Sequence, residues 1–207
     1  MTKEPDSTLD ALRKGLALAP DQIKTNLVTP VFVPSSFFSL GNWVGPYLEL
    51  RAKEIGLTWS VMLPNQTMRY VDRDLAQYWE QSGLDWKRIA LRNLSEHSNQ
   101  NPGTHEFRRA NGERYAVAMM HEDGIGPSRL LLRDQLSHVF PNGYRVALPE
   151  MSCALAFMRD LEPSEFAQIR ELIDRCFEKG TRPLAPGIYD PDDLLPVANK
   201  LNFSTSG

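Results

Sequence analysis

The dipeptide Asn111-Gly112 places the strongest local constraint on the fold of this chain. It separates residues 104–110 from residues 113–120, and both runs suit β-strands. A type I′ turn needs a positive φ at both central residues, and Asn-Gly adopts that conformation at little cost. The pair therefore predicts a two-residue β-hairpin and, with it, an antiparallel sheet.

Other strand-like segments also come in neighbouring pairs. In residues 57–63 the apolar side chains alternate with Thr58, Ser60 and Met62, which is the period of a half-buried strand. The remaining candidate strands contain β-branched and other apolar residues and are bounded by prolines and turn signals. Besides the hairpin, strands are predicted at residues 27–33, 57–63, 67–71, 144–148 and 153–158.

Helical spacing of apolar residues occupies the segments between these strands. The clearest helix is 163–179, whose apolar residues fall on one face and which Gly180 follows. Further helices are predicted within residues 1–20 and at 45–55, 72–81, 85–97 and 127–140. Paired strands with helices between the pairs indicate an α+β fold: mainly antiparallel sheets covered by amphipathic helices.

Length and proline content predict the domain organisation. A chain of 207 residues can bury a large core, and we expect one α+β domain over residues 26–197, with any subdomain break near 98–104. An N-terminal helical segment, 1–25, precedes this domain, and a frayed tail, 198–207, follows it. Four prolines between residues 181 and 197 predict an extended C-terminal wrap.

The charge balance disfavours a general nucleic-acid binder. There are 23 basic and 26 acidic residues, a net charge of −3, so no global positive field is available to neutralise a phosphate backbone. The one candidate for a local basic stripe is Arg108, Arg109 and Arg114 around the predicted turn. No nucleic-acid partner is expected.

The cysteines and the apolar runs predict a cytosolic protein. Cys153 and Cys176 lie far apart within apolar patterns, which indicates buried, reduced thiols and neither a disulfide framework nor a zinc site. No apolar h-region follows the N-terminal charges, and no apolar run reaches roughly 18 residues. We therefore expect a cytoplasmic location without a membrane-spanning segment.

The most suggestive stretch for binding is residues 121–129, which lead from a predicted strand through a glycine loop into a helix. Free backbone N–H groups and the helix dipole at such a junction favour an anion. The candidate ligand-binding residues are Gly124, Gly126, Ser128 and Arg129. The alternative is a structural turn in which Pro127 takes the first helical position and Ser128 caps the helix.

His121 and Asp123 are the weak candidates for a metal site or an acid–base pair. They lie two residues apart, so they share a strand face, and His97 or His105 would have to approach across the fold to join them. The alternative is a charged strand end in water. Because no nucleophile elbow and no metalloprotease motif is present, we assign no catalytic residue, and we predict no cofactor.

Several short segments, taken in order, resemble the YtpQ-like family of bacterial proteins over residues 57–197. The matching segments are Met68-Arg69-Tyr70-Val71, Leu91-Arg92-Asn93-Leu94, Asp123-Gly124, Ser128-Arg129-Leu130-Leu131-Leu132 and Pro183-Leu184-Ala185-Pro186. The resemblance implies a cytosolic bacterial protein of unknown function and carries no catalytic residues. The chain departs from the family pattern at Ile125-Gly126-Pro127.

Two functional hypotheses follow. The first is a non-enzymatic interaction or regulatory protein that offers a groove or an edge strand to another protein, and it rests on the lack of a convergent catalytic set. The second is a small-molecule binding protein or enzyme that holds an anionic ligand at residues 121–129. The orientation of Arg129, toward a concave pocket or flat against an acidic neighbour, distinguishes them.

Overall fold

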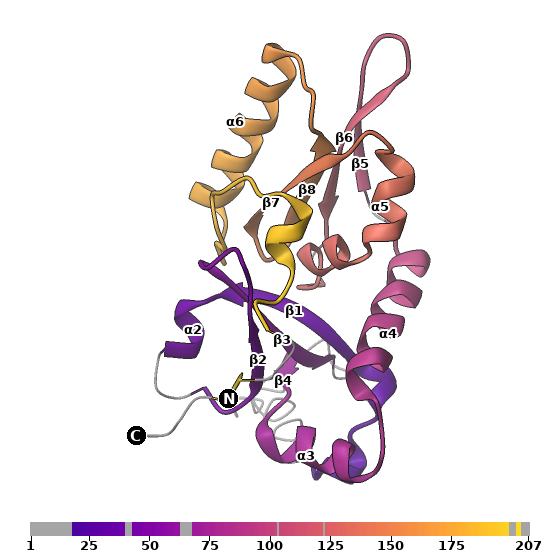
Figure 1. Ribbon diagram of the computed structural model, residues 1–207, viewed down its shortest axis with the longest axis vertical. Helices are drawn as coiled ribbons and strands as arrows, with labels where there is room; N and C mark the ends of the chain where they lie inside the picture. The colour runs from indigo at the N-terminus through magenta and orange to yellow at the C-terminus, as the bar shows by residue number, and fades with distance from the viewer. Residues whose placement is uncertain are drawn as a thin grey trace, which may run out of the picture.

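The fold is α+β, with two antiparallel sheets that occupy the lower and upper halves of the molecule in Figure 1. The computed structural model describes residues 18–39, 43–62, 68–102, 104–121, 123–198 and 202–203. The chain forms β1 to β4 of the first sheet before the second sheet begins at residue 104, and β9 returns to the first sheet near the C-terminus. The predicted fold class is confirmed.

The first sheet has β3 at its centre. Antiparallel pairing with β1 runs from Val28 opposite Val61 to Pro34 opposite Ile55. The other edge of β3 pairs with β2 near its start and with β4 near its end. The strands are β1 (Val28–Pro34), β2 (Pro46–Glu49), β3 (Ile55–Met62), β4 (Met68–Tyr70) and β9 (Asn202–Phe203), and β9 pairs with β2.

The helix predicted at 45–55 is wrong, because that segment contains β2 and the beginning of β3. Leu48 pairs with Leu57 in the sheet, and the buried Leu50 forms a bridge with Pro196 of the C-terminal segment. Tyr47 stacks on Phe38 with ring centroids 4.0 Å apart. Contacts with distant residues therefore outweigh the local helical spacing.

The strand predicted at 57–63 is confirmed as β3, but it is buried on both faces. Trp59 and Val61 pack against α3 (Arg73–Gln81) and α4 (Trp86–Gln100) on one face. Thr58 and Ser60 on the other face are also fully buried, and the Thr58 hydroxyl donates to the Pro46 carbonyl at 2.9 Å. The alternation in sequence therefore reflects the two faces of the strand, and it does not mean that one face is exposed to solvent.

Helix α4 joins the two halves of the molecule along one side in Figure 1. Its N-terminus is capped as predicted, because the Asp85 carboxylate accepts from the Arg88 N–H. Near the middle of α4, Asn93 donates to the carbonyls of Thr25 and Val28, which fixes the helix on the beginning of β1.

The second sheet has the strand order β5-β6-β8-β7. The strands are β5 (Thr104–Arg108), β6 (Arg114–Met120), β7 (Tyr144–Glu150) and β8 (Cys153–Met158). The predicted hairpin joins β5 and β6, but its loop has three residues instead of two. The Gly112 N–H donates to the Arg109 carbonyl, and Gly112 has φ +86°, which is the pattern of a turn followed by a left-handed residue.

Two helical layers cover opposite faces of this sheet (Figure 1). Helix α6 (Pro163–Lys179), predicted with these bounds, buries Ile169 and Ile173 against one face. The helix predicted at 127–140 is instead two pieces, the 3-10 helix η3 (Pro127–Leu131) and α5 (Arg133–Val139), because Leu132 has a non-helical ψ of 58°. Cys153 is buried as predicted, whereas Cys176 on α6 is only half-buried.

The C-terminal segment is an extended wrap that contacts both sheets. It forms bridges from Tyr189 to Val146 and from Pro183 to Glu150 in the second sheet, in addition to the bridge to Leu50 in the first. The 3-10 helix η4 (Pro191–Leu194) lies within it. Residues 202–203 pair with β2, so the prediction of a frayed end is wrong at these two residues.

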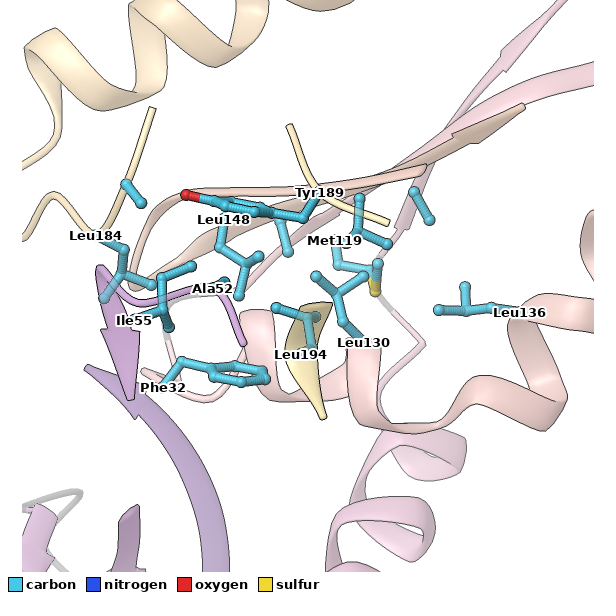
Figure 2. Packing of buried hydrophobic residues seen from close by; sticks show 14 of the residues in the cluster. Phe32, Ala52, Ile55, Met119, Leu130, Leu136, Leu148, Leu184, Tyr189 and Leu194 are labelled. Atoms are coloured by element: carbon cyan, nitrogen blue, oxygen red, sulfur yellow. The ribbon is translucent and has the colours of Figure 1, made fainter. Parts of the chain in front are cut away.

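One apolar core lies between the two sheets. Figure 2 shows Phe32 and Ile55 of the first sheet on one side of this core and Leu148 of the second on the other. Leu184, Tyr189 and Leu194 of the wrap belong to the same cluster (Figure 2). The wrap therefore joins the two sheets through side-chain burial as well as backbone pairing.

Near the N-terminus, two 3-10 turns precede β1 in the described residues. These turns are η1 (Pro20–Gln22) and η2 (Thr25–Leu27), while the rest of the helix predicted within residues 1–20 lies outside the described residues. The short helix α2 (Ser36–Ser39) follows β1. No helix among the described residues is long and apolar enough to cross a membrane.

Candidate anion-binding pocket

The junction between β6 and η3 is a tight, buried turn. The Asp123 carboxylate accepts from the Ile125 N–H at 3.0 Å, and Gly124 takes the left-handed conformation with φ +73°. A Cβ added to Gly126 would lie 3.2 Å from the Ser152 carbonyl oxygen. Both glycines are therefore explained by the turn itself.

The turn holds a buried ion pair between Arg129 and Asp123. The two guanidinium Nη atoms contact the two carboxylate oxygens at 2.9 and 3.4 Å, and the side chains are 5% and 16% exposed. Burial alone would raise the pKa of Asp123, but the hydrogen bonds and charge of Arg129 hold it below its ordinary value. Asp123 is therefore ionised, and it fixes the position of Arg129.

Two histidines approach the same carboxylate. His97 Nε2 lies 3.3 Å from Asp123 Oδ2, and His121 Nδ1 lies 4.0 Å from it. Burial, followed by the charge of Arg129, lowers the pKa of His121, so this imidazole is neutral near pH 7. His105, the other predicted neighbour, is exposed on β5.

Among the residues that the structure describes, a guanidinium and two imidazoles lie beside the Asp123 carboxylate. Asp123 is already engaged by Arg129, and within the described part of the chain no group of three or more His, Cys, Asp or Glu side chains is arranged to hold a metal ion. The structure brings His121, Asp123 and His97 together, but the charge that they surround is the guanidinium of Arg129.

The backbone of the glycine loop is also occupied. The N–H groups of Ser128 and Arg129 donate to the carbonyls of Ile125 and Gly126, and η3 has only five residues. The Ser128 hydroxyl is buried without a partner among the described residues, so Ser128 does not cap the helix as the structural alternative expected. The loop geometry therefore does not support the binding of an anion by these amides.

Arg129 instead lines a cavity on the side of the second sheet that α5 covers. The cavity has a volume of about 290 Å³ and lies between the end of α4, the β5–β6 hairpin and α5. Its apolar lining is formed by Pro102, Val117, Met119, Leu132, Leu136 and Val139. Its polar lining is formed by Ser98, Asn99, Thr104, Glu106, Arg114, Arg129 and Gln135. Figure 2 shows where Met119 and Leu136 enter this region from β6 and α5.

Arg114 is the second guanidinium of this cavity. It forms an ion pair with Glu106, which also accepts from Arg108 Nε at 2.9 Å. The Nε atoms of both Arg114 and Arg129 are buried, and neither has a hydrogen-bond partner among the described residues. A buried N–H without a partner costs free energy, so both guanidinium groups have unused capacity to bind an acceptor.

The basic stripe considered from the sequence is largely neutralised in the fold. Arg109 makes two hydrogen bonds to Glu165, at 2.7 and 2.8 Å, and a third to Glu113. Arg108 and Arg114 share Glu106. Each of the three arginines thus pairs with a carboxylate, and together they do not form a continuous positive surface for a phosphate backbone.

The sequence pointed to Arg129 as part of the glycine loop, whereas the structure also places it on the lining of a cavity formed by other elements. Sequence reasoning named Arg114 only as a member of a basic stripe, and it assigned no role to Glu106. Strand period could have indicated that Arg114 shares the β6 face of Ala116 and Ala118, but not that its guanidinium reaches a cavity beside Val117 and Met119. The cavity requires α4, α5 and the hairpin to be placed together.

Comparison of the chain with family models, with curated proteins and with solved structures found no match in any of the three. The resemblance to the YtpQ-like family therefore stays a prediction, and the candidate site rests on the geometry described above.

Proposed function

We propose that this protein binds a small organic monoanion, a carboxylate with an apolar body, in the cavity between α4, the β5–β6 hairpin and α5. The observation that carries the proposal is the pair of guanidinium groups, Arg114 and Arg129, on a cavity with an apolar floor, each with a buried Nε–H that has no partner in the described structure. Pockets that combine an apolar lining with a few fixed polar groups are the usual sites for small ligands.

The local charges favour a monoanion. Of the residues that line the cavity, Arg114 and Arg129 are positive and Glu106 is negative, which leaves an excess of one positive charge. His121 adds no charge near pH 7, because burial and Arg129 lower its pKa. A ligand with a single negative charge completes this balance.

The shape of the donors and the size of the cavity favour a carboxylate. A guanidinium is a planar donor that matches a planar carboxylate, and Asp123 already holds Arg129 in one orientation. A cavity of about 290 Å³ is at the small end for ligand sites, so the ligand has few atoms. The floor of Val117, Leu136 and Val139 suits a branched or aromatic group.

Calorimetric titration tests the proposal with 3-methylbutanoate and benzoate as probes and benzamide as the uncharged control. We expect both carboxylates to bind and benzamide to bind at least about tenfold more weakly, since a charged hydrogen bond contributes roughly 1.5–3 kcal/mol. Arg114→Gln is the test variant because Arg114 is 28% exposed and pairs with Glu106 and not with Asp123. It should weaken carboxylate binding by about tenfold or more.

Arg108→Gln is the matched control. It removes the same charge from the same Glu106 network, but Arg108 does not line the cavity. We expect little change in carboxylate affinity for this variant. Equal losses in the two variants, equal binding of benzamide, or no binding of either carboxylate at millimolar concentration would each contradict the proposal.

The alternative, an interaction protein that offers an edge strand, would use β5. This strand is outermost in the second sheet, and its side chains are mostly exposed. However, β5 carries Glu106 and Arg108, and charged side chains on an edge strand oppose pairing with another chain. The cavity therefore favours anion binding more than this edge favours a protein partner.

A further inference from the structure

Helix α5 borders a second cavity as well as the proposed anion site. Leu136 and Val139 line the first cavity, whereas Arg133 and Ser137 line the second. The second cavity has a volume of about 320 Å³, and its other walls are the beginning of β7, the residue that follows β8, and the wrap at η4. The two cavities thus lie against different faces of the same short helix.

The charged side chains of the second cavity leave one negative charge in excess. Arg133 Nη2 lies 2.6 Å from Asp192 Oδ1, and Arg159 Nη2 lies 2.8 Å from Asp190 Oδ1. Asp193 also lines the cavity; its carboxylate accepts from the Asp190 N–H at 2.9 Å and forms no ion pair among the described residues. Two guanidinium groups and three carboxylates therefore favour a ligand with one positive charge.

Tyr144 contributes a hydroxyl without a partner to this cavity. The residue lines the cavity but is only 6% exposed, because its ring packs beside Phe140 in the apolar core, with ring centroids 6.0 Å apart. The hydroxyl oxygen is buried and has no hydrogen-bond partner in the described structure. Burial raises the pKa of Tyr144, so the hydroxyl keeps its proton near pH 7. A buried polar group of this kind costs free energy until a ligand satisfies it.

We propose that the second cavity binds a small hydrophilic primary amine in its ammonium form. The ammonium has one positive charge, which balances the excess carboxylate, and three N–H donors. The acceptors that face it are the hydroxyls of Tyr144 and Ser137 and the carboxylate of Asp193, from β7, α5 and η4. Pro191 is the only residue of the described lining without a polar side chain, so the ligand has little apolar surface.

The lining favours an ammonium over a metal ion or an anion. Over the ranges that the structure describes, no three His, Cys, Asp or Glu side chains are grouped to hold a metal ion. An anion would add to the excess negative charge. The first cavity has the opposite excess, so the two sites do not depend on one another, and binding at one can fail while binding at the other succeeds.

NMR titration of the full chain with ethanolamine at pH 7 tests the proposal. Ethylene glycol is the uncharged control, and tetramethylammonium is the cation without an N–H donor. We expect ethanolamine to bind and each control to bind at least about tenfold more weakly. Equal binding of either control, no ethanolamine binding at millimolar concentration, or displacement of ethanolamine by equimolar Mg²⁺ would each overturn the proposal.

Two tyrosine variants locate the bound amine. Tyr144→Phe should weaken ethanolamine binding by about tenfold without lowering the urea midpoint, because the lost hydroxyl has no partner in the described structure. Tyr115→Phe is the matched control: Tyr115 is also 6% exposed, but its hydroxyl donates to Gln168 at 3.0 Å, and it does not line the cavity. This control should lower the midpoint and keep the wild-type affinity. The opposite pattern, a lower midpoint and unchanged binding for Tyr144→Phe, would give the Tyr144 hydroxyl a structural role only and overturn the site.

Two aspartate variants test the charge. Asp193→Asn removes the excess negative charge but keeps an oxygen that can accept from the Asp190 N–H, and it should weaken ethanolamine binding by about tenfold or more. Asp160→Asn removes the same charge from an exposed residue that does not line the cavity, and the affinity should change little. Equal losses in the two variants would show attraction to the net charge of the chain and would contradict a site at Asp193.

Discussion

Arg129 is a residue whose neighbours determine what it can do. Asp123 makes two hydrogen bonds to its Nη atoms, while its Nε–H lies buried without a partner among the described residues. The carboxylate neutralises a charge that would otherwise be costly to bury at 5% exposure. Arg129 can thus be placed beside a cavity without destabilising the fold.

The Asp123–Arg129 pair gives a prediction for stability. Asp123→Asn leaves the buried guanidinium without its counter-charge, and we expect the free energy of unfolding in urea at pH 7 to fall by about 3 kcal/mol. Glu171→Gln is the control, because the exposed Glu171–Arg175 pair on α6 should contribute less than about 1 kcal/mol. Similar losses in both variants would contradict a special role for the buried pair.

The same pair predicts how stability depends on pH. Because the pKa of Asp123 is lower in the folded state, its contribution is fully present above the unfolded value of about 4 and is lost as the pH falls through the folded pKa. The wild-type chain should therefore lose stability on acidification below about pH 4 more steeply than Asp123→Asn. Parallel acid titrations of urea midpoints for the two chains measure this difference.

At the scale of the elements, the β5–β6 hairpin shows how one residue sets a turn. Gly112 has φ +86° in a three-residue loop, and no atom lies within 4 Å of a Cβ added there. A side chain at this position therefore meets no steric contact, and only the left-handed backbone opposes it. The two strands of the hairpin carry Glu106 and Arg114, which form an ion pair at the proposed site.

This turn gives a prediction with a matched pair of variants. Gly112→Ala should reduce the free energy of unfolding by roughly 1–2 kcal/mol, because a Cβ is unfavourable in the left-handed region. Gly112→Asn should cost less, since asparagine tolerates this conformation better than alanine. Urea unfolding followed by circular dichroism compares them, and an asparagine variant no more stable than the alanine variant would contradict the backbone explanation.

At the scale of the whole molecule, the C-terminal wrap connects two sheets that follow one another along the chain. Leu184, Tyr189 and Leu194 are buried in the core that both sheets share, and the Tyr189 hydroxyl donates to Glu54 at 2.7 Å. Because the wrap contributes to one continuous core, we expect the two halves to unfold together.

The positions of the tryptophans make this expectation measurable. All four, Trp43, Trp59, Trp79 and Trp86, precede the second sheet, so their fluorescence reports on the first half, whereas far-ultraviolet circular dichroism reports on both. The two probes should give one urea midpoint. Leu194→Ala should lower both midpoints together, at a cost of about 3 kcal/mol, and separate transitions would show two independently stable domains.

The sequence by itself determined the local features whose causes lie close together in the chain. The apolar face of α6, the Asp85 cap of α4 and the Asn111-Gly112 turn each depend on residues a few positions apart, and their positions or type were predicted. The α+β class followed from the order of such elements. These signals survive in the fold because no distant contact opposes them.

Only the tertiary structure decided the features that depend on distant contacts. Residues 45–55 have helical spacing, yet β3 and Pro196 draw them into a sheet. Arg114 and Arg129 are brought to one cavity because α4 and α5 close over the face of β6. In each case the deciding free energy comes from packing between segments far apart in sequence, which periodicity within one segment does not encode.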